Sequence, residues 1–149
     1  MTSPRNVLFL CTGNSARSIM AEAYANHAAG GAWRAHSAGS TPTGAPNPFA
    51  LETLRRHGID PGEPRSKSWD EFAADDAPKM DLVVTVCDNA AGEVCPVWPT
   101  RDGTAPQKLH WSLPDPAAAP HEEERRAAFE GVFQDLKTRI DGLFTEYAA

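Results

Sequence analysis

Short apolar runs alternate with longer amphipathic stretches along this chain. The short runs predict strands at Asn6–Cys11, Trp33–Ala38, Asp81–Cys87 and Lys108–Trp111. The first and third are almost continuously apolar, which is typical of strands that are covered on both faces of a parallel sheet.

The longer stretches carry apolar residues at helical spacing. They predict helices at Ala16–Ala29, from Asn47 or Pro48 to His57-Gly58, at Trp69–Asp76 and at His121–Tyr147. The first helix is expected to pack through Ile19, Met20, Ala23, Tyr24 and His27, and the last through Phe129, Val132, Phe133, Leu136, Ile140, Leu143 and Phe144. Loops are expected at Asp88–Asp102, with a helical turn near Asn89–Val94, and at Leu113–Pro120.

This alternation predicts the α/β class, with a four-stranded, mostly parallel sheet flanked by helices on both faces. A length of 149 residues fits one domain, residues 1–149. Ligands in such sheets bind beyond the carboxyl ends of the strands. Cys11 and Cys87 both lie at predicted strand ends, and Asp115 follows soon after another.

Charge and cysteine content narrow the choice of partners and compartment. The formal net charge of −6 argues against a nucleic-acid or anionic membrane surface, so an anionic substrate would need a local positive site. We expect no membrane span and no signal peptide, and therefore a cytoplasmic protein. Three cysteines do not suit a secreted disulfide framework.

One loop carries the strongest chemical pattern. Residues Cys11-Thr12-Gly13-Asn14-Ser15-Ala16-Arg17-Ser18, called the Cys11–Ser18 loop below, join the first strand to the first helix. Backbone N–H groups of a curled loop and of a helix N-terminus bind anions. Gly13 and Asn14 tolerate unusual backbone angles, and the planar guanidinium of Arg17 can grip an oxyanion.

Cys11 should be a nucleophile in that loop. A helix N-terminus and a nearby arginine lower the pKa of a thiol, and the Ser18 hydroxyl can donate to the sulfur. The alternative is a buried structural cysteine, with Arg17 on a solvated helix face. Asp115, held between Pro114 and Pro116, could protonate a leaving oxygen or be an ordinary turn residue.

The other two cysteines have both structural and chemical interpretations. Cys87 could be a core cysteine, whereas Cys95 lies in a loop. Zinc would require closer spacing and a fourth ligand, and His36, His57, His110 and His121 lack ligand spacing, so we expect no metal and no cofactor.

The Cys11–Ser18 loop resembles the phosphate loop of the low-molecular-weight protein tyrosine phosphatase superfamily. The three cysteines more narrowly resemble the arsenate reductases built on that fold, and the resemblance extends from Asn6 to about Ala118. It implies that Cys11 attacks arsenate, that Arg17 and loop N–H groups stabilise charge, and that Asp115 protonates the departing oxygen.

The resemblance also implies a disulfide relay. Cys87 would attack the Cys11–arsenic adduct and release arsenite, and Cys95 would then form a Cys87–Cys95 disulfide for an external thiol to reduce. The Cys87–Cys95 gap is one residue longer than in the best-known members. The extra cysteines favour thioredoxin as the reductant; glutaredoxin with glutathione, or mycothiol, remain alternatives.

Two other functions stay open at this point. A low-molecular-weight protein tyrosine phosphatase would need only Cys11, Arg17 and Asp115. Such phosphatases usually carry tyrosines shortly after the Asp-Pro pair, where this chain has Ala117–Ala119, which favours a smaller substrate. A non-catalytic anion-binding module would not need all three residues.

Loop support is expected from Asn14, Glu22 and Lys67. Some relatives bind potassium through residues matching Asn14, Glu22 and the Ser66 region, and Lys67 stands where an acidic ligand is expected. Its ammonium could take the place of the cation near Glu22; the alternative is a solvated surface lysine.

Overall fold

A four-stranded parallel sheet forms the centre of the molecule. The computed structural model describes residues 5–62, 64–74, 76–86 and 106–146. Strands β1 (Arg5–Leu10), β2 (Trp33–Ala38), β3 (Leu82–Thr85) and β4 (Gln107–His110) lie in the order β2-β1-β3-β4. All three pairings are parallel, so the predicted fold class is confirmed.

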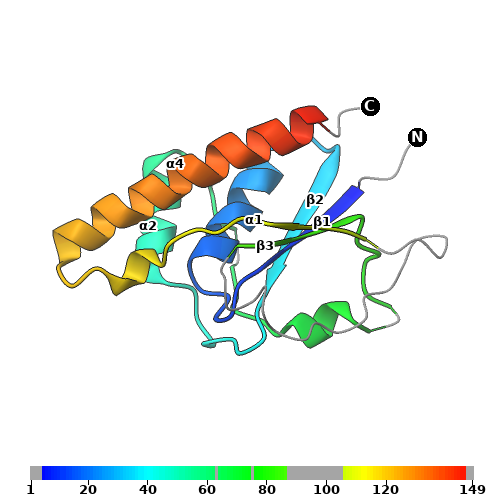
Figure 1. The fold of residues 1–149 in the computed structure, drawn as a ribbon, viewed down its shortest axis with the longest axis horizontal. Helices are drawn as coiled ribbons and strands as arrows, with labels where there is room; N and C mark the ends of the chain where they lie inside the picture. The colour runs from blue at the N-terminus through cyan, green and yellow to red at the C-terminus, as the bar shows by residue number, and fades with distance from the viewer. Residues whose placement is uncertain (1–4, 63, 75, 87–105, 147–149) are drawn as a thin grey trace.

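The strands end together, and this brings the candidate residues to one edge of the sheet. Leu10 pairs with Ala38 of β2 and with Thr85 of β3, and Thr85 pairs with His110 of β4. The segments that follow these strands therefore leave the sheet side by side, where an α/β sheet binds ligands. Figure 1 shows the loops after β1 and β2 and the segment after β4 meeting at this edge.

Three α-helices cover one face of the sheet among the described residues. They are α1 (Arg17–Ala28), α2 (Pro48–Arg56) and α4 (Glu122–Glu146). Helix α2 begins where Asn47 accepts a hydrogen bond from the Phe49 N–H and Pro48 supplies a helical φ angle at the first position. The long helix α4 crosses over α1 and α2 in Figure 1.

The two faces of β1 belong to two apolar cores. Val7 and Phe9 pack toward the α-helices, whereas Leu8 and Leu10 pack on the opposite side with Phe72 and other residues. That opposite side carries the short 3-10 helix η1 (Trp69–Phe72). Burial of β1 on both faces explains its continuous apolar sequence.

A side chain of α1 occupies the outer edge of β2. Asn26 donates its Nδ2 hydrogen to the Ala35 carbonyl oxygen at 3.1 Å and accepts the Ala35 N–H through Oδ1 at 2.8 Å. A single amide group thus satisfies both backbone groups of an edge-strand residue, as a neighbouring strand would.

Some local predictions are wrong in detail. The helix predicted at Trp69–Asp76 is limited to η1, and the loop predicted at Leu113–Pro120 contains a 3-10 helix, η2 (Pro116–Ala118), which Asp115 caps. His27 is exposed at the end of α1 rather than packed. The predicted loop and turn within 88–102 lie outside the described residues.

Candidate active site

The Cys11–Ser18 loop is held by hydrogen bonds to its backbone carbonyl groups. The carbonyl oxygens of Thr12, Gly13 and Ser15 accept N–H groups of Thr41, Thr43 and Asn47 at 2.9, 3.0 and 2.7 Å. The N–H of a trans peptide unit points opposite to its carbonyl, so the N–H groups that follow these carbonyls face away from residues 41–47. Such an arrangement of N–H groups suits an anion.

Asn14 holds the sharpest point of the loop. It is fully buried and has a φ of 46°, the one positive φ of a non-glycine residue in the described chain. Its side chain donates to Ser18 Oγ at 2.8 Å and accepts the Lys67 N–H at 2.8 Å. Because asparagine tolerates the left-handed region, this residue both adopts the turn and fixes it.

The helix that follows the loop begins without a side-chain cap. Ala16 precedes α1, and its methyl side chain cannot cap the N–H groups of the first turn. No capping side chain therefore occupies the N–H groups of the first turn, and they and the positive end of the helix dipole remain available to a ligand in the loop. Cys11, which is 5% exposed, lies directly after β1.

Arg17 links the loop to the segment that carries Asp115. Its Nη1 donates to the Leu113 carbonyl oxygen at 2.8 Å. Its Nε is buried and has no hydrogen-bond partner among the described residues. A buried, unpaired guanidinium nitrogen costs free energy, and an oxyanion in the loop would supply the missing acceptor.

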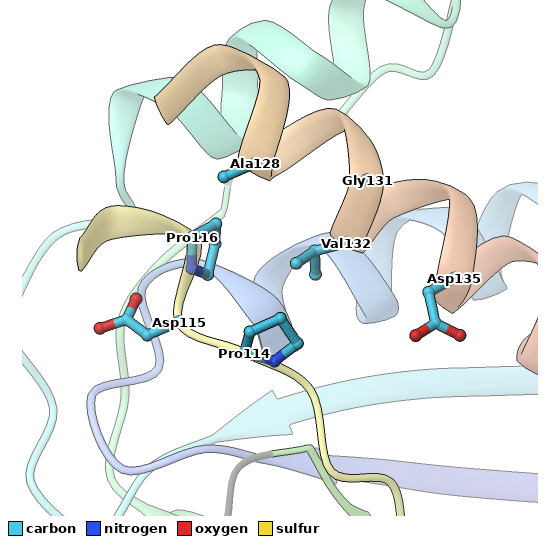
Figure 2. Close-up of a pocket in the computed structure, with 7 residues that line it drawn as sticks. All are labelled: Pro114, Asp115, Pro116, Ala128, Gly131, Val132 and Asp135. Atoms are coloured by element: carbon cyan, nitrogen blue, oxygen red, sulfur yellow. The ribbon is translucent and has the colours of Figure 1, made fainter. Parts of the chain in front are cut away.

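Asp115 is exposed and lies two residues beyond Leu113. Its Oδ1 accepts the Ala117 N–H at 3.0 Å, which places the carboxyl at the start of η2. Behind it lies a cavity of about 180 Å³ between this segment and α4, lined by Pro114, Asp115, Pro116, Ala128, Gly131, Val132 and Asp135. Figure 2 shows the Asp115 carboxylate pointing away from Asp135.

Lys67 lies below the loop, beside Glu22. Its side chain is 8% exposed, and its Nζ is 3.6 Å from Glu22 Oε1. The same nitrogen donates to Ser37 Oγ at 3.3 Å and to the Arg65 carbonyl at 3.1 Å. Three oxygen atoms thus surround one ammonium group, and Lys67 is not a solvated surface lysine.

Burial opposes charge on both members of this pair. It raises the pKa of Glu22, and the Lys67 ammonium acts in the opposite direction. Burial likewise lowers the pKa of Lys67, while Glu22 raises it. The attraction between the two groups therefore opposes the effect of burial, which remains the larger influence on the pKa of each group.

Cys87 and Cys95 lie outside the described residues. Val86, which precedes Cys87 in the chain, donates its N–H to the Leu10 carbonyl at 2.9 Å. Leu10 is in turn the residue before Cys11. Within the described part of the chain, histidine, cysteine and acidic side chains form no group of three that could hold a metal ion.

Two contributors to this site carry no sequence pattern that would identify them. The Leu113 carbonyl binds Arg17, and the Ser37 hydroxyl binds Lys67. A backbone carbonyl leaves no signal in a sequence, and Ser37 has only the small polar side chain expected of many strand residues. The His110 side chain contacts Thr85 on the neighbouring strand, where Thr85 Oγ1 lies 2.7 Å from His110 Nδ1.

Comparisons with known proteins agree on one family. The profile of the low molecular weight phosphotyrosine protein phosphatases matches residues 6–149. An arsenate reductase of Halalkalibacterium halodurans is 39% identical over 90% of this chain and 91% of its own length. The structure of an arsenate reductase in the phosphate binding state has a TM-score of 0.76 and 27% identity, covering 95% of this chain and 98% of that one.

A thioredoxin-dependent arsenate reductase of Corynebacterium glutamicum is also similar. Its TM-score is 0.70 and its identity 28%, and the match covers 98% of this chain but 63% of that chain. In the described part of this protein, no helix combines the length and the apolar character needed to cross a membrane.

Proposed function

Because this chain belongs to the low molecular weight phosphotyrosine protein phosphatase family, among its arsenate reductases, we propose that it reduces arsenate to arsenite with Cys11 as nucleophile. The whole chain, residues 1–149, forms one catalytic domain in this proposal. The observation that carries it is the buried Nε of Arg17, a residue of the Cys11–Ser18 loop, which has no hydrogen-bond partner in the part of the chain that the structure describes. An arsenate or phosphate oxygen would provide one.

In the first step the Cys11 thiolate attacks arsenic(V). Arg17 and the N–H groups from Thr12 to Ser18 stabilise the charge on the oxygens, and Ser18 donates to the sulfur. Asp115 gives a proton to the departing oxygen, which leaves as water. The exposed position of Asp115, two residues from the carbonyl that holds Arg17, supports this role.

In the second step Cys87 attacks the sulfur of Cys11. The sulfur–arsenic bond breaks and its electron pair stays on arsenic, so arsenite leaves and a Cys11–Cys87 disulfide forms. Two thiols are oxidised while arsenic(V) becomes arsenic(III). The hydrogen bond from the Val86 N–H to the Leu10 carbonyl supports an approach of Cys87 to Cys11, because Cys87 follows Val86 and Cys11 follows Leu10 in the chain.

In the third step Cys95 attacks Cys87, and an external thiol reduces the resulting disulfide. We propose thioredoxin as that donor, on the basis of the two additional cysteines and the similar thioredoxin-dependent enzyme. Glutaredoxin with glutathione, or mycothiol, are the alternatives. A cycle that depends on reduced thiols fits the cytoplasm.

We also propose that Lys67 acts as a built-in cation. Its ammonium contacts Glu22, Ser37 and the Arg65 carbonyl, a set of oxygen atoms that would otherwise suit a monovalent cation. Asn14 connects this cluster to the loop through the Lys67 N–H. No metal or other cofactor enters the proposed reaction.

One coupled assay tests the proposed function. Arsenate should drive the consumption of reduced thioredoxin, and hydrolysis of an aryl phosphate should be slow in comparison. Glutaredoxin with glutathione and mycothiol serve as parallel donors. Rapid aryl phosphate hydrolysis without arsenate-dependent oxidation of any donor would favour the phosphatase alternative.

A further inference from the structure

Gly39 follows β2 and lies against the backbone of the Cys11–Ser18 loop. A Cβ atom built on Gly39 would lie 2.6 Å from the Cys11 carbonyl oxygen and 3.0 Å from the Asn14 nitrogen, and closer still to the Thr12 carbonyl oxygen. Real Cβ atoms do not approach other atoms so closely. All three neighbours are backbone atoms, which cannot rotate away as a flexible side chain can.

The need for glycine at this position is steric. Gly30, Gly44, Gly58 and Gly62 have positive φ angles, and a Cβ on any of them would meet no atom within 4 Å. Gly39 shows the opposite combination, since its φ is not in the left-handed region but its surroundings leave no space. Glycine is therefore required here by the close approach of another segment.

Gly39 is also fixed from its other side. Its N–H donates to the Lys67 carbonyl and its carbonyl accepts the Trp69 N–H, each at 2.9 Å. The preceding residue, Ala38, accepts the Cys11 N–H at 3.2 Å. A side chain at position 39 would therefore displace the loop more readily than the strand.

We propose that Gly39 is a positioning residue for oxyanion binding. Its lack of a side chain lets the end of β2 touch the carbonyl groups of Cys11 and Thr12, which sets the curvature of the Cys11–Ser18 loop. Ser66 contributes to the same curvature, because its hydroxyl donates to the Gly13 carbonyl at 3.0 Å from outside the loop. The inference rests on the proposed function, in which this loop binds arsenate.

The test compares Gly39→Ala with the wild-type protein and with Gly142→Ala. Gly142 lies on α4, where a Cβ meets nothing within 4 Å, so this variant controls for the added methyl group. The rate at which iodoacetamide alkylates Cys11 is followed by mass spectrometry of its peptide, across pH and phosphate concentration. Thermal melting checks that each variant is folded.

We expect phosphate to protect Cys11 in the wild-type protein and in Gly142→Ala at the same concentration. Gly39→Ala should need at least about tenfold more phosphate for half protection, as expected when donors to an oxyanion move out of line. Its alkylation profile should also move toward the pKa of an ordinary thiol, about 8.5. Ser66→Ala should also raise the phosphate concentration needed for half protection and move the alkylation profile toward that of an ordinary thiol, each by a smaller amount.

The outcomes separate this inference from the proposed function. No phosphate protection in the wild-type protein would overturn the proposed oxyanion site itself. Protection that is equal in the wild-type protein and in a folded Gly39→Ala would overturn the role of Gly39, because a purely structural glycine would change only the melting temperature. If Gly39→Ala does not fold, Ser66→Ala decides, and wild-type values in that variant overturn the proposal.

Discussion

Arg17 donates a hydrogen bond from Nη1 to the Leu113 carbonyl oxygen at 2.8 Å, across 96 positions of the chain. The guanidinium that is proposed to bind the oxyanion therefore also holds the segment that leads to Asp115. The Arg17 side chain therefore serves both the proposed anion binding and the placement of Asp115, the proposed acid. A planar group with several donors can make both sets of contacts at once.

Arg17→Lys should reduce kcat/KM for arsenate by about 10²–10³-fold, the usual cost of losing a donor to a developing oxyanion. Lysine supplies a charge but cannot reach Leu113 and the anion with the same planar geometry. Steady-state kinetics with arsenate measure the change. Rates within twofold of wild type would show that a point charge is sufficient.

Cys11→Ser should abolish arsenate reduction and any phosphatase side activity. Serine has nearly the same size, so the loop contacts of Asn14 and Thr12 should persist and the melting temperature should change little. Both assays are run on the purified variant. Turnover in either one would refute the nucleophilic role of Cys11.

Asp115→Asn should slow the first chemical step by about 10²–10⁴-fold, the range typical of a general acid. Binding of the oxyanion should be largely unchanged, because Asn can still accept the Ala117 N–H and keep η2 capped. Single-turnover rates and phosphate protection of Cys11 measure the two effects separately. An unchanged rate across pH would leave Asp115 as a turn residue.

Lys67→Met should destabilise the protein by about 3 kcal/mol near neutral pH, the lower end for a broken buried ion pair, since Glu22 is 20% exposed. Without the ammonium, burial would raise the pKa of Glu22 further. A carboxyl with a raised pKa in the folded state favours folding at low pH, and this contribution is lost as pH rises through that pKa. Urea unfolding should therefore show a larger deficit at roughly pH 8 than at roughly pH 5.

Potassium provides an independent measurement of the same cluster. The wild-type protein should melt at the same temperature in sodium and potassium buffers of equal ionic strength, because Lys67 already occupies the space beside Glu22. A potassium-specific rise in the wild-type melting temperature would contradict the built-in cation.

The two cysteines of the proposed relay should fail at different steps. In the Cys87→Ser variant, Cys11 should still attack arsenate, but no arsenite should be released. Cys95→Ser should release up to one arsenite per enzyme and then stop as a Cys11–Cys87 disulfide. Single-turnover arsenite release and mass spectrometry of the linked peptides measure both. Multiple turnovers by Cys95→Ser with thioredoxin as sole reductant would exclude the three-cysteine relay.

Local patterns predicted the sheet because each strand carries its own signal. The bounds of β2 agree with the prediction, Trp33–Ala38, and those of β1 and β4 differ by one residue at each end. The Trp69–Asp76 prediction failed because Phe72 is buried against the second core while the residues after it have little apolar surface to bury. Apolar contacts confined to one turn, from Trp69 to Ala73, support a single 3-10 turn better than a longer helix.

The site was less predictable where it depends on contacts between distant segments. Gly39 resembles a turn glycine in the sequence, and only the position of Cys11 and Thr12 reveals why a side chain is excluded there. The pattern around Lys67 allowed either burial or exposure. Lys67 is buried because residues 65–69 pack against the loop, which places its ammonium next to Glu22 and Ser37.

The amide of Asn26 on the outer edge of β2 also bears on strand pairing between molecules. An open edge strand invites strand-by-strand growth into aggregates. At Ala35 a second chain would first have to displace two hydrogen bonds that an exposed side chain of α1 already makes. Asn26 therefore occupies the groups that strand pairing at Ala35 would need, and it does so without burying a charge or shortening the strand.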